Sequence, residues 1–326
     1  METSTHILFG VGIASLASLD PNLQEYSLPV YVSCVLASNA PDFDYALKLK
    51  GKSEYYKLHR GFSHSLIMLP LWAFMITAGI ALIYPDTEFL QHLFLWNLGA
   101  VIVHVLTDLL NFHGTQVFRP FTEKWFSFDC VPLFDYFIFL LHISGMVVSL
   151  IGFHPGKTFL AIYLLMFIYI LLRFAVRSYI YHQLTAQFLK SKEMKILPNM
   201  DLYSWQVIIE CEEYYILGRY TWGEFVVDSV LQKETSHSWI EISKQNKDIS
   251  NFITSTIFIY PRVIERKEAL EVRWIDLRFR KGRRFPFKAI WVFSHHKSLE
   301  KSYVGWFHHP TQYKRIKKEL VNEVSK

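Results

Sequence analysis

The sequence predicts a membrane all-α bundle followed by a C-terminal, cytoplasmic, mostly β (α+β) domain, and three observations lead to this fold class. Hydrophobic residues make up 51% of the chain and charged residues only 19%, a balance that excludes a simple cytosolic enzyme and a disordered chain. Residues 1–174 hold only 9 of the 34 Lys and Arg. The second half replaces long apolar runs with short aromatic and β-branched segments. We therefore expect a membrane domain over residues 1–175 and a basic domain over residues 176–326.

Four apolar stretches approach the roughly 20 residues that a helix needs to cross the hydrocarbon core. They are Leu66–Tyr84, His92–Leu110, Leu133–Phe153 and Thr158–Phe174. Two shorter runs, Ile7–Leu19 and Leu28–Ala40, fit a re-entrant hairpin, a thin spanning pair or helices buried by the rest of the bundle. No Lys or Arg precedes the first run, so we interpret it as a retained helix and not as a signal peptide.

The charges between these runs indicate their orientation. Lys and Arg crowd the loop before Leu66, whereas Asp20 and Asp86 mark acidic turns on either side. Because cytoplasmic loops carry the excess of Lys and Arg, we expect this loop to be cytoplasmic. Alternation from there predicts a multi-pass protein with both termini inside.

The second half is predicted to begin with a continuation of the last apolar helix, over residues 158–196, which Pro198 ends. Strand character follows at Trp205–Cys211, Tyr214–Tyr220, Phe225–Leu231, Leu270–Arg280 and Phe285–Phe293. A turn at Lys281–Arg284 and a basic helix near Tyr313–Val324 complete this small domain. The basic runs favour contact with anionic membrane lipid, and no nucleic-acid-binding motif is visible, so we expect no nucleic acid as a partner.

Ionisable side chains gather at one end of the predicted bundle. On the topology above, the cytoplasmic end holds His6, Asp42, Asp44, His59, Arg60, His64, His104, Asp108 and His113. Ionisable groups in or beside a membrane are costly to keep, so this clustering indicates a functional site. The three cysteines form no Cys-x-x-C pair, so any metal here must be held by histidine and carboxylate.

Two spacings within this set carry specific chemistry. His104 and Asp108 stand at i and i+4 on one helix face, which lets both side chains reach one cation, although a buried hydrogen bond is an equal alternative. Asp42 and Asp44 form an Asp-x-Asp pair in a tight loop, where a solvated turn is the simpler interpretation.

The segment of residues 59–65, HRGFSHS, places two histidines around a glycine and ends in a serine expected to cap the next membrane helix. Such a loop is shaped to receive a metal or an anion. Arg60 offers a planar fork that suits a phosphate or carboxylate oxygen, although an anchor on the cytoplasmic side would account for it as well.

Taken in order, STH at residues 4–6, PDFD at 41–44, HRGFSHS at 59–65 and His104-x-x-x-Asp108 resemble the motifs of a known family. It is the bacterial inner-membrane metal-dependent hydrolase family of the YdjM/YbcI type, and in particular its YfhP-like branch. The resemblance covers roughly residues 1–175 and implies a metal-dependent hydrolase in the bacterial cytoplasmic (inner) membrane.

A weaker likeness is to the zinc phospholipase C and P1-type nuclease group. The residues that follow the same order as the zinc ligands of that group are His6, Asp42 or Asp44, His59, His104, Asp108 and His113. The chain lacks the N-terminal Trp ligand and a clear later H-x-x-x-[DE]. The likeness therefore implies one or two metals instead of three.

We expect a metal-dependent hydrolase that acts on a phosphoester, or on a lipid-like substrate, at the cytoplasmic leaflet. Zinc fits histidine and carboxylate donors best, with Mn²⁺ or Fe²⁺ as alternatives. The expected metal residues are His6, Asp42, Asp44, His59, His104, Asp108 and His113, and the expected catalytic residues are Arg60 and His64. The rival is a non-enzymatic membrane protein, either an ion transporter or an anchor for the C-terminal domain. A transporter should hold its ionisable groups near the midplane of the membrane, whereas these gather at one end.

Overall fold

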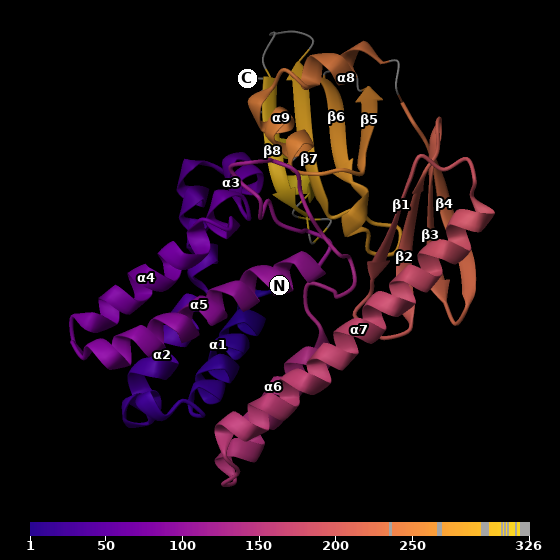
Figure 1. The fold of residues 1–326 in the computed structure, drawn as a ribbon. Coiled ribbons are helices and arrows are strands. Elements are labelled where there is room, and N and C mark those ends of the chain that lie inside the picture. The colour runs from indigo at the N-terminus through magenta and orange to yellow at the C-terminus, as the bar shows by residue number, and fades with distance from the viewer. Residues whose placement is uncertain are drawn as a thin grey trace.

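The computed structural model describes the chain except residues 235–236, 266–268, 295–299, 308, 310, 312, 317 and 320–326. The regular elements up to Gln187 are helices, joined between residues 111 and 135 by a long irregular segment, and two antiparallel four-stranded sheets follow (Figure 1). The predicted combination of an apolar helical region with a C-terminal α and β region is therefore confirmed.

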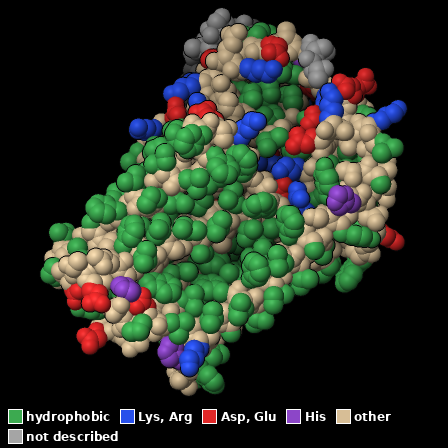
Figure 2. Space-filling view, in the orientation of Figure 1, with side chains coloured by type: hydrophobic (Ala, Val, Ile, Leu, Met, Phe, Trp, Pro, Cys, Tyr) green, Lys and Arg blue, Asp and Glu red, His purple; other side chains and the backbone are tan. Residues whose placement is uncertain are grey.

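Six helices build the apolar region: α1 (Thr3–Ala17), α2 (Ser27–Ala37), α4 (Met68–Ala81), α5 (Thr87–Leu110), α6 (Tyr136–Leu150) and α7 (Pro155–Gln187). Apolar side chains cover much of the helical surface, while charged side chains gather over the sheets and at the helix tips (Figure 2). Leu82, Leu150 and Leu164 are among the exposed apolar residues. An apolar surface of this extent is typical of a region that contacts lipid.

Two helices in the described part of the chain are long and apolar enough to cross a membrane, α5 with 24 residues and α7 with 33. A bent pair adds a third span if it is counted as one, because the segment Lys52–His64 meets α4 at 81°. Helices α4 and α6, with 14 and 15 residues, are shorter than the runs predicted for them. The predicted number of four spans and their orientation therefore stay predictions.

The short N-terminal hairpin packs into the bundle mainly through α1, whereas α2 leaves Leu28 and Val32 exposed, so whether the hairpin spans the membrane stays a prediction. Helix α1 packs against α2, α5, α6 and α7 and buries Phe9, Ala14 and Ala17. At Gly10 a Cβ atom would lie 2.4 Å from the Ser38 Oγ, so only glycine permits the two helices to approach this closely. This approach brings the end of α2 toward the start of α1.

The helix predicted over residues 158–196 was wrong at its end. Helix α7 ends at Gln187, and Glu193–Pro198 forms strand β1, which pairs antiparallel with β2 (Ser204–Glu210). Residues such as Met194 and Leu197 favour a helix by propensity, but both are buried in the β1–β2 pairing. Tertiary packing therefore overrides local preference here.

The two sheets are meanders. The first sheet continues with β3 (Tyr214–Thr221) and β4 (Glu224–Gln232), and the second contains β5 (Ile259–Glu265), β6 (Ala269–Asp276), β7 (Phe287–Ser294) and β8 (Glu300–Trp306). Helices α8 (Ser238–Ser243) and α9 (Lys247–Thr254) pack on one face of the second sheet. The sequence predicted one small domain and missed β1, β5, β8 and both helices. The predicted C-terminal helix is present where it is described, up to Glu319, and its end lies outside the described residues.

The second sheet contacts the loops at one end of the bundle. Short segments η2 (Ala40–Lys50), α3 (Lys52–Leu58) and η3 (Phe62–His64) lie between α2 and α4, and α3 packs against α9 and β8. Lys247 pairs with Glu54 at 2.6 Å, and Tyr56 stacks edge-on against Phe287. The Arg278 Nη1 donates to the Phe112 carbonyl at 3.2 Å. These contacts bring the sheet beside the polar end of the bundle.

Candidate metal centre

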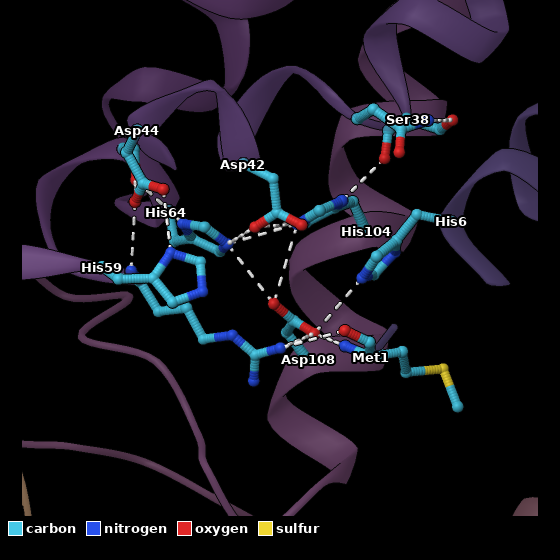
Figure 3. A network of polar contacts seen from close by, with 12 residues as sticks. Met1, His6, Ser38, Asp42, Asp44, His59, His64, His104 and Asp108 are labelled. Atoms are coloured by element: carbon cyan, nitrogen blue, oxygen red, sulfur yellow. Dashed lines mark hydrogen bonds and ion pairs between the residues drawn. The ribbon is translucent and has the colours of Figure 1, made fainter. Parts of the chain in front are cut away.

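Side chains from four separate segments converge at the polar end of the bundle (Figure 3). Asp42 comes from η2, His64 from η3, His104 and Asp108 from the last turns of α5, and His6 from the first turn of α1. Asp42, His64, His104 and Asp108 each offer a ligand atom, and these four atoms all lie within 4.8 Å of one another. All but Asp42 are buried.

The separations within this group match the requirements of one small cation. The His64 Nε2 lies 3.2 Å from the His104 Nε2 and 3.3 Å from the Asp108 Oδ2. The His104 Nε2 lies 3.6 Å from the same Asp108 oxygen, and the Asp42 Oδ1 lies 3.5 and 3.7 Å from the two imidazole nitrogens. A tetrahedral ion with bonds of about 2.0 to 2.1 Å holds its ligands about 3.3 Å apart. Five of the six separations among these atoms are therefore close to the value that such an ion requires.

The hydrogen bonds around the two imidazoles fix which nitrogen carries the proton. The His104 Nδ1 lies 2.6 Å from the Ser38 carbonyl oxygen, which can only accept, so Nδ1 is the donor. The Ser63 hydroxyl donates to the Asp44 Oδ2 at 2.7 Å and therefore accepts from the His64 Nδ1 at 2.9 Å. In both neutral rings the Nε2 atom is then a bare acceptor that points into the cluster.

Four acceptors consequently meet with no donor between them. The Asp42 Oδ1 and Asp108 Oδ2 are buried and have no hydrogen-bond partner among the described residues. Burying such groups without compensation is costly, because each loses its water. A divalent cation removes this cost by accepting a lone pair from each group, so the donor set fits a metal ion.

A second group shares Asp42 with the first and adds Asp44 and His59. The His59 Nδ1 lies 2.8 Å from the Asp44 Oδ1, and the Arg60 backbone N–H donates to the other Asp44 oxygen at 3.2 Å. Asp44 is therefore largely occupied by its neighbours. It orients His59 in the way that carboxylates orient metal-binding histidines, and it leaves the His59 Nε2 available. Tyr55 also stacks on the His59 ring with centroids 4.7 Å apart, at the i, i+4 spacing of a helix.

Asp108 is held in place from the opposite side of its carboxylate. Its Oδ1 receives the Arg60 Nη2 at 3.0 Å, the Asn111 Nδ2 at 3.3 Å and the amino group of Met1. The His6 Nε2 lies 3.4 Å from the same oxygen, and the His6 ring stacks on His104 with centroids 3.7 Å apart. His6 therefore lies beside the four-residue group, and neither of its ring nitrogens has a hydrogen-bond partner among the described residues.

Arg60 adopts a backbone conformation that non-glycine residues seldom use, with φ of 61°. Its N–H is bonded to Asp44, and its carbonyl accepts from the Gln116 N–H at 2.9 Å. Its guanidinium is buried and also donates to Asn111 and to the Met1 carbonyl. The strain at Arg60 is therefore maintained by contacts that place its charge against Asp108.

The structure places Ser65 and His113 differently from what the sequence predicted. Ser65 does not cap α4, because the N-cap residue of this helix is Ile67, which makes no side-chain capping bond. The serine of this motif that contacts the cluster is Ser63. His113 joins neither group of ligand atoms and lies against Phe112 and Phe279, with ring centroids 5.4 and 4.7 Å away. The chain turns away from α5 at Asn111, which carries His113 toward the second sheet.

A cavity of about 260 Å³ lies beside the cluster, between the bundle and the second sheet. From the bundle side it is lined by Lys48, Tyr55, Tyr56, His59, Arg60, His113 and Trp125. From the C-terminal side it is lined by Ser255, Arg278, Phe279, Phe287 and Trp306. Cations and aromatic rings therefore surround a space that reaches His59 and Arg60.

Burial and charge favour the ionisation states that metal binding requires. Burial lowers the pKa of His64, which favours the neutral ring. Burial alone would raise the pKa of Asp42, but when the nearby rings are protonated, a hydrogen bond from His64 and the charges of His104, His64 and His59 lower this pKa below its usual range. The Asp42 carboxylate is therefore stabilised by positive charge at this position, which a metal ion would supply in place of those protons.

The fold and the site together define a membrane protein with an apolar helical region, a cluster of histidines and aspartates suited to a metal, and a C-terminal region of antiparallel sheets. The chain belongs to the YdjM inner membrane protein family, whose members it matches over residues 1–180. Residues 238–317, which contain the second sheet with α8 and α9, match the YfhP C-terminal alpha/beta plait domain.

One relative is similar over nearly the whole chain. It is the "Uncharacterized protein YfhP" of Bacillus subtilis (strain 168), which is 33% identical over 314 residues that cover 94% of this chain and 95% of the relative. No solved structure matches the chain. The family resemblance expected from the motifs is thereby confirmed, and so is a membrane location.

Proposed function

We propose that the protein is a membrane-bound, metal-dependent hydrolase of a phosphoester. The observation that supports this most strongly is the meeting of four acceptor atoms, on Asp42, His64, His104 and Asp108, at separations suited to one ion. Zinc is the metal that two imidazoles and two carboxylates in this arrangement favour. When bound, such an ion would activate water and polarise the ester.

The residues around the cluster would perform the remaining tasks. Ser38 and Ser63 fix the imidazole tautomers, and Arg60 fixes Asp108. The second group would let Asp42 bridge two ions, with His59 as a ligand of the second. His6, stacked on His104, would support the first group.

The adjacent cavity supports a phosphate-bearing substrate. Lys48, Arg60 and Arg278 place positive charge on its wall, and guanidinium and ammonium groups bind phosphate oxygens by charge-assisted hydrogen bonds. The rings of Tyr55, Trp125 and Phe279 offer an apolar surface for the rest of the substrate. The C-terminal sheet would therefore complete the substrate pocket, in addition to being anchored by the bundle.

Hydrolysis of bis(p-nitrophenyl) phosphate and p-nitrophenyl phosphate by the full chain in detergent tests this proposal. We expect turnover that requires Zn²⁺ or Mn²⁺, stops with EDTA and is lost in Asp42→Asn, because that substitution removes a ligand charge. A wild-type protein that binds metal yet turns over neither phosphoester, nor a carboxylic ester or amide, would favour a non-enzymatic role.

A further inference from the structure

The second sheet has a face that α8 and α9 do not cover. Residues paired in register lie on the same face, so Arg262 on β5 and Arg273 on β6 lie side by side, and Lys288 on β7 pairs with Ile275. Trp274 and Trp291 alternate with these residues and pack on the opposite face, toward the helices. A cavity of about 250 Å³ opens on the first face. We call it the basic sheet cavity.

The lining of the basic sheet cavity is strongly cationic. Its charged residues are Arg262, Arg273, Arg283, Arg284 and Lys288. Glu271 pairs with Arg273 at 2.7 Å and offsets one of these charges. In the described part of the chain, Arg262, Arg283, Arg284 and Lys288 make no ion pair with a carboxylate.

This arrangement brings like charges together, with Arg262, Arg283 and Arg284 exposed at the mouth of the cavity. Like charges directly opposite each other on paired strands destabilise a sheet, and Arg262 lies opposite Arg273. Lys288 is partly buried, and its ammonium faces the rings of Phe307 and Tyr313 at 5.3 and 5.0 Å from their centroids. A bound anion would offset the repulsion between these cations. The apolar packing of the other face does not need the cations to be placed together.

We propose that the basic sheet cavity binds a compact phosphate-bearing group, either as free phosphate or pyrophosphate or as the head group of an anionic lipid. Arginine forks match phosphate oxygens in geometry, and Phe285, Phe307 and Tyr313 limit the space around them. A local cavity favours such a group over a nucleic-acid strand, which needs an extended groove. This site is separate from the metal cluster and does not depend on the proposed hydrolase activity.

The test is calorimetric titration of inorganic pyrophosphate into the full chain in a nonionic detergent with EDTA, which excludes binding through a metal. We expect saturable binding that weakens about tenfold or more in Arg262→Gln, because one charge-assisted contact is lost. The matched control is Lys281→Gln, which removes one charge from the turn beside the cavity without removing a lining residue. Dihexanoyl phosphatidic acid added to the same micelles should compete if the natural source is lipid.

A second measurement separates binding from folding. Arg262→Gln should unfold at the same temperature as the wild type or at a higher one without pyrophosphate, since it relieves the repulsion with Arg273. Pyrophosphate should raise the unfolding temperature of the wild type only. The proposal is overturned if the wild type does not bind at low salt, or if Lys281→Gln loses as much affinity as Arg262→Gln. Tighter binding of a single-stranded oligonucleotide that is lost in Arg262→Gln would overturn it in favour of nucleic acid.

Discussion

The Nε2 atoms of His64 and His104 lie 3.2 Å apart while the Nδ1 atom of each ring faces another oxygen. Two neutral imidazoles in this arrangement point lone pairs at each other, and two carboxylate oxygens point at the same place. Each proton position follows from an acceptor that cannot donate, namely the Ser38 carbonyl for His104 and the Asp44 carboxylate, through Ser63, for His64. The metal assignment therefore depends on the partners of the ligands as much as on the ligands themselves.

Ser63→Ala should weaken metal binding about 10- to 100-fold while the fold is retained, because the proton on the His64 Nδ1 loses its acceptor. Titration of zinc into the metal-free protein with a competing chelator measures this. Ser65→Ala is the matched control, because the Ser65 hydroxyl has no hydrogen-bond partner among the described residues. Equal affinity in Ser63→Ala and the wild type would remove the tautomer argument.

Arg60→Lys should keep most of the metal but lower phosphoester turnover about a hundredfold, because lysine preserves the charge without the planar fork. The guanidinium contacts both Asp108 and Asn111, and an ammonium group cannot reproduce both contacts in the same geometry. Metal content and turnover are measured on the same preparation. If Arg60 serves only as a cytoplasmic anchor, turnover will equal that of the wild type.

Ser255→Trp should abolish most turnover without loss of metal, because the new ring would fill the cavity from its C-terminal wall. The matched control is Thr254→Trp, since Thr254 is exposed and does not line the cavity. A Ser255→Trp variant with wild-type rates would show that substrate reaches the cluster by another route.

Pyrophosphate binding at the basic sheet cavity should weaken as pH rises through about 8, because burial and Arg273 lower the pKa of Lys288 to about 8. Below that pH the ammonium is charged and attracts the anion, and above it the neutral amine does not. The other ionisable groups near Lys288 are Arg262, Arg273, Glu271, Arg283, Arg284, His309 and Tyr313. Lys288→Arg should lose this decline, as titrations at pH 7 and pH 9 would reveal. A decline of equal size in both proteins would exclude Lys288 as its cause.

The convergence at the polar end of the bundle could be predicted from the sequence. His6, Asp42, His64 and Asp108 occupy the ends of apolar runs that loop charge places on one side, and the i, i+4 spacing joins His104 to Asp108. The Ser38 carbonyl could not be foreseen as a partner of His104, because every residue carries a backbone carbonyl. The sequence also did not reveal that His113 lies apart from the metal cluster, because this depends on a turn of the chain at Asn111.

Two of the missed strands carry local signals that weaken a strand pattern. Strand β1 begins with the good helix formers Glu193, Met194 and Lys195, and β5 contains Pro261, which an edge strand tolerates. The basic sheet cavity depends on register, because Arg262 faces Arg273 only through the β5–β6 pairing. The sequence alone shows only that Arg262 and Arg273 belong to a basic domain, and it does not show that they lie side by side.

The number of metal ions per chain in the purified full-length protein tests the central claim most directly. Elemental analysis should find about one or two zinc or similar ions per chain in the wild type, as a tetrahedral or two-metal site requires. His104→Ala should lose most of the metal, whereas His142→Ala, which removes a buried histidine of α6 outside the cluster, should retain it. A wild-type protein that neither carries nor takes up a divalent metal, or a His104→Ala variant that keeps its full complement, would contradict the account.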